Sequence, residues 1–315
     1  MMCTLQLKVS MNQDQVQDRL SVMRAQEDST YWCSDYFRDL QQVESNSDDS
    51  GPIDHVCRSK MTQWCYSVID FIQFRRETVG IAMSYLDRFL CTDAPRARQV
   101  RNCRKLYQLA SMTALFMAIK INEPVMIDLN ILTDLSKGLY TFADFTKMEN
   151  DILFALNWHV NGPTPQEFMV HILTLVQQQE TKADTSYSLN IDFKNILEQA
   201  TYQIEVAIGE HDLMTQKPSN VATASIWNCI EHQGLISSLN QVASSLGIIL
   251  EDISSTRERL IELKQRSKME TRTSMRSIPE TQSKSSKTVT SSMQCTTDDS
   301  KHCSPICVSK RSLTG

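Results

Sequence analysis

The fold of this chain is decided by residues 76–90, which read RETVGIAMSYLDRFL. Six apolar residues in this stretch recur at helical spacing and would share one face of a helix: Val79, Ala82, Met83, Leu86, Phe89 and Leu90. A helix with so wide an apolar face is not stable alone in water, so neighbouring elements must cover it. The carboxylate of Asp87 lies at the edge of that face and needs either a partner or a path to water.

The same periodicity continues on both sides, and it predicts an all-α protein with five helices in each half. In the first half the other helices are expected at 57–74, 106–120, 127–135 and 142–156, with a basic loop at 96–105. Thr164, Pro165 and Glu167 have the pattern of a capped helix start and open the second half. Its helices are expected at 168–178, 193–209, 218–232, 239–246 and 250–265. The small residues at 219–225 predict a buried central helix there.

Composition divides the chain into four segments. Residues 1–54 hold ten Asp or Glu against four Lys or Arg and are expected to be mostly disordered. The aromatic cluster at 31–37 is interpreted either as a short helix that packs on the body or as a partner-docking segment. Residues 55–162 and 163–265 are expected to be two helical domains, and the Ser- and Thr-rich residues 266–315 a disordered tail.

Several classes of function are disfavoured by the sequence. A formal net charge of −5 argues against a general nucleic-acid binder. No apolar run reaches the ~18 residues of a membrane span, no secretory signal is evident, and the ten scattered cysteines indicate reduced thiols. No catalytic or phosphate-binding motif is present, and His302, Cys303 and Cys307 have no fourth metal ligand nearby. We therefore expect a binding protein that is no enzyme and needs no cofactor or metal.

Four charged residues lie on or beside apolar helical faces: Arg58, Asp87, Lys120 and Glu149. Burying an unpaired charge is costly, so each must be paired or must reach water. One interpretation is that the side chains extend to the surface. The other divides them into one internal pair and one pair that meets a partner molecule.

The chain resembles the cyclins, most closely the mitotic and D-type groups. Four blocks carry the resemblance, at residues 58–64, 76–90, 109–124 and 148–165. Together they cover about residues 55 to 170, and the second half resembles a carboxy-terminal cyclin fold more weakly, through Lys217-Pro218-Ser219 and the helix after it. The resemblance implies tandem five-helix cyclin folds and a subunit that activates a cyclin-dependent kinase in the cell cycle.

The resemblance also implies roles for particular residues. Arg58 and Asp87 would form a buried structural ion pair. The kinase-binding residues would be Lys120, Glu149, Glu123, Leu153 and Trp158. Kinase substrates or inhibitors are further implied partners, through a docking patch of which Met61 and Trp64 remain, although Lys60 places a charge in it. Ser304, followed by proline in the tail, is a candidate phosphosite.

The implied location is the nucleus, the cytoplasm or both, without nucleic-acid or membrane binding. Two other functions stay open: a transcription adaptor with the same fold, and a helical scaffold that binds no kinase. The adaptor would require a basic surface facing nucleic acid, which the acidic composition does not favour. The scaffold predicts that reversing the charges of Lys120 and Glu149 affects no binding partner.

Overall fold

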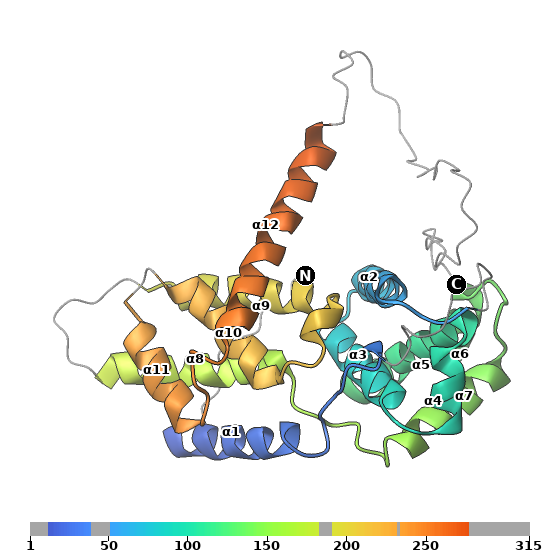
Figure 1. Ribbon diagram of the computed structural model, residues 1–315, viewed down its shortest axis with the longest axis horizontal. Coiled ribbons are helices and arrows are strands. Elements are labelled where there is room, and N and C mark those ends of the chain that lie inside the picture. Colours follow the sequence, from blue (N-terminus) through green and yellow to red (C-terminus); the bar gives the residue numbers. More distant parts are fainter. Residues whose placement is uncertain (1–11, 39–50, 183–190, 232–233, 277–315) are drawn as a thin grey trace.

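The computed structural model describes residues 12–38, 51–182, 191–231 and 234–276, and within these ranges it contains helices and no strands (Figure 1). The helices pack around two apolar cores, which lie side by side along the long axis. The all-α prediction is therefore confirmed. Residues 277–315, which include the candidate phosphosite Ser304, lie outside the described ranges.

The first core is built by six helices: α2 (His55–Ile72), α3 (Glu77–Leu90), α4 (Pro95–Arg101), α5 (Arg104–Asn122), α6 (Leu129–Leu135) and α7 (Phe142–Ala155). Helix α3 packs mainly against α5, and α5 also packs against α7. The six apolar residues predicted to share one face of α3 are each no more than 2% exposed. The stretch at 76–90 therefore forms the centre of the first half.

The second core is built by α8 (Pro165–Lys182), α9 (Phe193–Ile208), α10 (Pro218–Ile230), α11 (Ile236–Ser245) and α12 (Ser254–Arg276), with the short 3-10 helix η2 (His211–Leu213). Helix α10 contacts each of the other four α-helices. Five of its small residues have no exposed surface: Ser219, Ala222, Thr223, Ala224 and Ser225. Small side chains let the neighbouring helices approach closely, so the prediction of a buried central helix is confirmed.

Capping explains where two of the predicted helices begin. At the start of α8, the Glu167 N–H donates to Thr164 Oγ1 at 3.1 Å, and the Thr164 N–H donates to Glu167 Oε2 at 3.3 Å. At the start of α7, Thr141 and Asp144 exchange the same pair of bonds, at 3.3 and 2.8 Å. These reciprocal bonds satisfy backbone N–H groups that the helix itself leaves unpaired.

The prediction of a mostly disordered segment over residues 1–54 does not hold for residues 12–38. Residues Gln13–Glu27 form helix α1, which begins with a capping box between Asn12 and Gln15. Helix α1 packs on α8, and its Val16, Leu20 and Met23 have no exposed surface. These three residues have helical spacing, but the polar and charged residues between them make the segment hydrophilic on average.

After α1, residues 28–38 cross from the second core to the first, and we call them the strap (Figure 1). Tyr36 and Phe37 are 2% and 8% exposed and belong to the first core. Trp32 is 58% exposed. Of the two interpretations of this aromatic cluster, packing on the body holds for Tyr36 and Phe37, but without a helix before residue 38.

Two further differences concern helix bounds. Residues Pro95–Arg101 form helix α4, within the segment 96–105 that is predicted as a basic loop. Ala97 and Val100 are fully buried, Arg98 is exposed, and Arg96 and Arg101 are half-buried. Only two of its seven residues are buried apolar ones, which is too few to show a helical periodicity in the sequence. Helix α12 continues to Arg276, beyond the predicted end at residue 265, and it projects away from the body (Figure 1).

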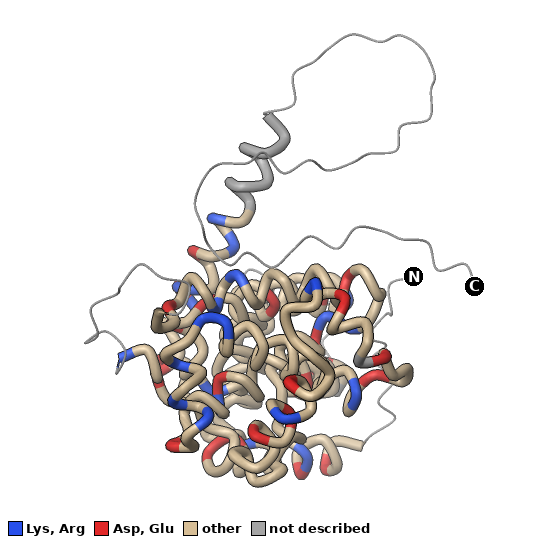
Figure 2. Tube along the Cα trace, turned by 90° about the vertical axis from the view of Figure 1, so that its right-hand side faces the viewer, with Lys and Arg blue, Asp and Glu red and all other residues tan. Residues whose placement is uncertain are grey.

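Polar contacts join the two halves. Arg58 Nη1 donates to the backbone oxygen of Ile208 at 2.7 Å, and Arg76 Nε donates to Glu205 Oε2 at 2.7 Å. Charged residues of both signs are intermixed along the described chain (Figure 2).

Candidate functional site

A buried ion pair joins the first two helices of the first half. Arg58 on α2 donates to Asp87 on α3 through Nη2 at 2.7 Å and through Nε at 3.1 Å. Both side chains are less than a tenth exposed. Burial alone would lower the pKa of Arg58, but the charge and hydrogen bonds of Asp87 raise it above its ordinary value. The structure thus brings together the two residues that the resemblance pairs.

The strap adds a third member to this pair. Tyr36 donates from its hydroxyl to Asp87 Oδ1 at 2.9 Å. Burial, and then the charge of Asp87, raise the pKa of Tyr36 well above its ordinary value. No spacing pattern in the sequence predicts this contact, because Tyr36 and Asp87 are 51 residues apart.

Lys120 and Glu149 lie at the surface on neighbouring helices. Lys120 is in the last turn of α5 and Glu149 is in the middle of α7, and Lys120 Nζ donates to Glu149 Oε1 at 3.1 Å. The two side chains are 45% and 18% exposed. The pair is therefore accessible to a partner, unlike Arg58 and Asp87.

Exposed apolar side chains follow both members of this pair along the chain. Ile121, Val125 and Met126 come after Lys120 and are 45–66% exposed, and Phe154 and Trp158 come after Glu149 and are 68% and 61% exposed. Exposed apolar residues beside polar ones are typical of protein interaction sites. We call Lys120, Glu149 and these five residues the α5–α7 surface.

Trp158 occupies an unusual backbone conformation. Asn157 and Trp158 both have positive φ angles, of 49° and 61°. Such angles are uncommon outside glycine, and for a bulky residue they mark a genuine outlier. The Trp158 N–H donates to the Leu153 oxygen at 3.0 Å, and the Trp158 ring packs edge-to-face with Phe154 at 6.2 Å. The backbone bonds after α7 therefore hold an exposed tryptophan in place.

Leu153 and Glu123 are placed differently from the exposed residues. Leu153 is half-buried and packs against the first core. The Glu123 side chain is only 3% exposed and forms an ion pair with Arg75 at 3.5 Å. It also accepts a hydrogen bond from the Thr78 hydroxyl. Glu123 therefore ties the end of α5 to the start of α3 and offers little surface to a partner.

The residues of the predicted docking patch are buried. Met61 and Trp64 on α2 are 5% and 6% exposed and belong to the first core, whereas Lys60 is exposed. Their role as a substrate-docking patch stays a prediction.

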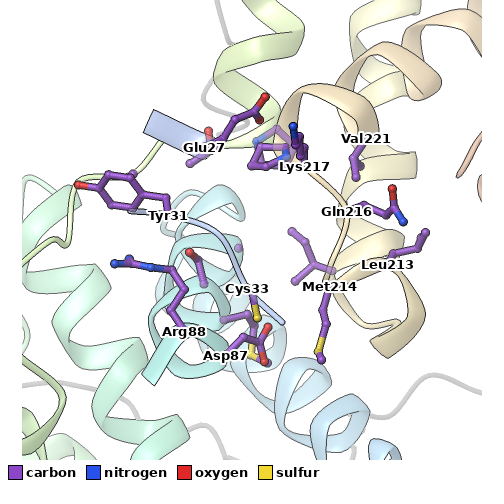
Figure 3. Close-up of a pocket in the computed structure, with 18 of the residues that line it drawn as sticks. Glu27, Tyr31, Cys33, Asp87, Arg88, Leu213, Met214, Gln216, Lys217 and Val221 are labelled. Carbon is purple, nitrogen blue, oxygen red and sulfur yellow. The ribbon is translucent and has the colours of Figure 1, made fainter. Parts of the chain in front are cut away.

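A cavity of about 130 Å³ lies at the junction of the two halves (Figure 3). The strap contributes Tyr31 and Cys33 to its wall, α3 contributes Arg88, and the segment before α10 contributes Met214 and Lys217. The Arg88 guanidinium lies 4.5 Å from the centre of the Tyr31 ring. No sequence motif indicated this cavity, because its walls come from segments far apart in the chain.

Two kinds of feature are absent from the described ranges. Among these residues there is no group of three or more His, Cys, Asp or Glu side chains that could hold a metal ion. None of the helices in the same ranges is long and apolar enough to cross a membrane.

In its described part the chain is thus an all-helical protein with two helical units, with one ion pair buried and one exposed in the first unit. Residues 18–161 match the family described as "Cyclin, N-terminal domain", which identifies this part of the chain as a cyclin domain. The match begins within α1, so the strap is part of the matched region.

Its relatives among characterised proteins are B-type mitotic cyclins, at a distance. G2/mitotic-specific cyclin-B2 of Mesocricetus auratus is 25% identical over 213 residues, which cover 64% of this chain and 48% of that protein. Cyclin-B2-1 of Oryza sativa subsp. japonica is 27% identical over 180 residues, which cover 56% and 37%. The chain thus spans half or less of the length of these relatives.

A solved structure has the same fold. The viral cyclin from herpesvirus saimiri superimposes with a TM-score of 0.57 at 16% identity, over 79% of this chain and 96% of that chain. The prediction of a cyclin fold is therefore confirmed.

Proposed function

We propose that this chain is a non-catalytic subunit that binds and activates a cyclin-dependent serine/threonine kinase and thereby regulates the cell cycle. The match to the cyclin N-terminal domain and the names of the mitotic relatives support the proposal. The observation that carries it is the α5–α7 surface, where an accessible Lys120–Glu149 pair is accompanied by exposed aromatic side chains.

The energetics of the exposed pair favour a role in binding. An ion pair this accessible contributes only about 0–1 kcal/mol to folding. The same charges become more valuable when a partner excludes water from them, and a desolvated pair among aromatic residues is typical of a binding hot spot. Lys120 then donates to carbonyl oxygens of the kinase, and Glu149 accepts from its N–H groups.

The mechanism that follows is allosteric. The kinase exists in active and inactive arrangements, and a partner that binds the active one more tightly shifts the population toward it. A rigid binding surface serves this purpose, and Glu123 and Leu153 supply rigidity because they attach α5 and α7 to the first core. The chain contributes no reacting group to phosphoryl transfer.

Three further expectations from the sequence are not tested by the structure: a phosphosite, a cellular location and a substrate-docking patch. Phosphorylation of Ser304, a nuclear location and substrate docking at Met61 and Trp64 stay predictions. The intermixed charges of the described chain offer no particular support for the transcription-adaptor alternative (Figure 2).

The test is to purify the chain with candidate cyclin-dependent kinases from its own organism and to measure phosphorylation of a histone substrate. The key variant combines Lys120→Glu with Glu149→Lys, which keeps the internal attraction but reverses the charges that a partner meets. The matched control combines Lys194→Glu with Glu198→Lys, which reverses an exposed pair on α9.

Binding and activation by the wild type and the control, together with loss of both in the key variant, would establish the function and its surface. Circular dichroism must show that all three proteins remain equally helical. Equal binding by the key variant would remove the α5–α7 surface from the proposal. If no kinase binds the wild type, the scaffold or adaptor function takes its place.

A further inference from the structure

Two cysteines from distant parts of the chain meet at the edge of the junction cavity. Cys33 lies in the middle of the strap, and Cys91 is the residue that ends α3. Their Sγ atoms are 3.3 Å apart, although the residues are 58 positions apart in the sequence. Cys33 lines the cavity beside Asp87 (Figure 3).

The surroundings give the two thiols different properties. Both Sγ atoms lie 3.3–3.4 Å from the Ser34 backbone oxygen. The hydrogen bond between the sulfurs lowers the pKa of Cys91 and, together with burial, raises the pKa of Cys33. Either thiol can be the donor in the contact between the two sulfurs. The lowered pKa makes Cys91 the thiol that more readily becomes the thiolate that oxidants attack. Cys91 is also the more exposed of the two, so a small oxidant reaches it first.

We propose that Cys33 and Cys91 are a redox modification site, which hydrogen peroxide or a similar peroxide converts into a reversible intramolecular disulfide. The Cys91 thiolate attacks one peroxide oxygen, the O–O bond breaks, and a sulfenic acid and hydroxide form. The Cys33 sulfur then displaces the sulfenic hydroxyl group. Overall, two thiols and one hydrogen peroxide give one disulfide and two waters, with both sulfurs oxidised and the peroxide reduced.

The required movement is small. A disulfide bond is about 2.05 Å long, so the sulfurs must approach by about 1.3 Å. Residues 32–35 have no regular secondary structure, and their backbone is free of helical hydrogen bonds that would resist this shift. The sulfurs already touch, so the bond forms within the chain in preference to a bond between chains.

The disulfide would fasten the strap across the junction of the two halves. On one side of Cys33, α1 packs on the second core, and on the other side Tyr36 bonds to Asp87 in the first core. Without the disulfide, only non-covalent contacts hold the strap over the cavity. Oxidation therefore fixes the strap in the position that the structure shows, and reduction leaves it held by non-covalent contacts alone. This inference is independent of the proposed kinase binding.

The experiment uses the full chain, reduced and then treated with hydrogen peroxide. After free thiols are blocked, tryptic peptides are identified by mass spectrometry with and without dithiothreitol. Limited trypsin digestion adds a second readout, because the Arg38 side chain is 82% exposed. Cys33→Ser is the test variant, and Cys103→Ser is the matched control, because Cys103 is a half-buried cysteine at the start of another helix.

The expected result is a dithiothreitol-sensitive link between the Cys33 and Cys91 peptides in the wild type and in Cys103→Ser, and none in Cys33→Ser. A fragment cut after Arg38 should stay attached to the oxidised chain until dithiothreitol is added. Amide hydrogen exchange over residues 31–37 should slow by roughly tenfold or more on oxidation. The proposal is overturned if Cys33 and Cys91 stay alkylatable after peroxide, or if links among the other cysteines form equally fast.

Discussion

Tyr36 and Asp87 share a 2.9 Å hydrogen bond, although one lies in the strap and the other in the helix that organises the first core. Asp87 also receives two bonds from Arg58, so one carboxylate joins the strap, α2 and α3. Because Arg58 in turn donates to the Ile208 oxygen of the second half, the cluster connects both cores. A buried charge of this kind is stable only while all of its partners are present.

Replacing Asp87 with alanine should therefore lower the free energy of unfolding by about 3–5 kcal/mol, because Arg58 is left buried and unpaired. Tyr36→Phe, which removes one neutral donor and keeps the ring, should cost only about 0.5–1.5 kcal/mol. Urea unfolding followed by circular dichroism measures both values. A similar loss in the two variants would show that the ion pair does not dominate the cluster.

Gly162 lies directly under the ring of Tyr31, and a Cβ at this position would overlap the ring carbons. Gly162→Ala should therefore displace the strap and cost about 1–3 kcal/mol. In a Tyr31→Ala background the same change should cost nearly nothing, because the obstructing ring is gone. A double-mutant cycle based on urea unfolding gives the coupling between the two sites.

Gly80→Ala is the comparison variant for Gly162→Ala, because it adds a Cβ at another crowded glycine. There the added Cβ would lie 2.9 Å from Ile208 Cδ1, which is the movable end of a flexible side chain. Because Gly80 is inside α3, alanine also gains about 1 kcal/mol of helix propensity. The change should be neutral or stabilising, and equal costs at Gly80 and Gly162 would contradict the importance of the Tyr31 contact.

The organising helix could be predicted because its information is local. The face of α3, the caps at Thr141 and Thr164 and the small residues of α10 all depend on residues within a few turns of one another. Helix α1 was missed because only Val16, Leu20 and Met23 carry its pattern amid polar residues.

The candidate site was predictable in part for the same reason. Lys120 and Glu149 stood out as charges beside apolar faces, and the family resemblance supplied their pairing. The strap contacts could not be foreseen, because nothing in the sequence near Tyr36 or Cys33 indicates which helix they meet. Glu123 shows a further limit, since its burial depends on Arg75 and Thr78, which are more than forty residues away.

Glu77, at the start of α3, provides a test of pH dependence. Burial is the main cause that raises the pKa of Glu77, while the hydrogen bond from the Thr164 hydroxyl partly opposes it. A raised carboxyl pKa means that the folded state binds the proton more tightly, so the free energy of unfolding rises as pH falls toward the ordinary value of 4.5. Glu77→Gln should thus be more stable than the wild type at pH 7, and this advantage should vanish near pH 4.5.

Urea midpoints measured between pH 4.5 and 7.5 would show this convergence. Asp144 supplies a control of opposite sign, because its capping bonds with Thr141 lower the pKa of Asp144. Asp144→Asn should be less stable than the wild type at pH 7, and the difference should shrink as the wild type loses stability below pH 4. A Glu77→Gln advantage that is independent of pH would point to packing instead of charge.

Trp158 separates binding from stability within the proposed kinase surface. Because its ring is 61% exposed, Trp158→Ala should change the free energy of unfolding by no more than about 0.5 kcal/mol. Exposed tryptophans at interfaces are frequent hot spots, so kinase binding should weaken by about 2 kcal/mol, or roughly thirtyfold in Kd. Titration calorimetry with the kinase measures the change.

Trp32→Ala is the matched control, because Trp32 is 58% exposed but lies on the strap. It should leave kinase affinity unchanged, since the strap is not part of the α5–α7 surface. If Trp32→Ala weakens binding as much as Trp158→Ala, the kinase contacts the strap as well, and the interface extends across the junction of the two halves. If neither variant affects affinity, the positive φ of Trp158 serves only to end α7.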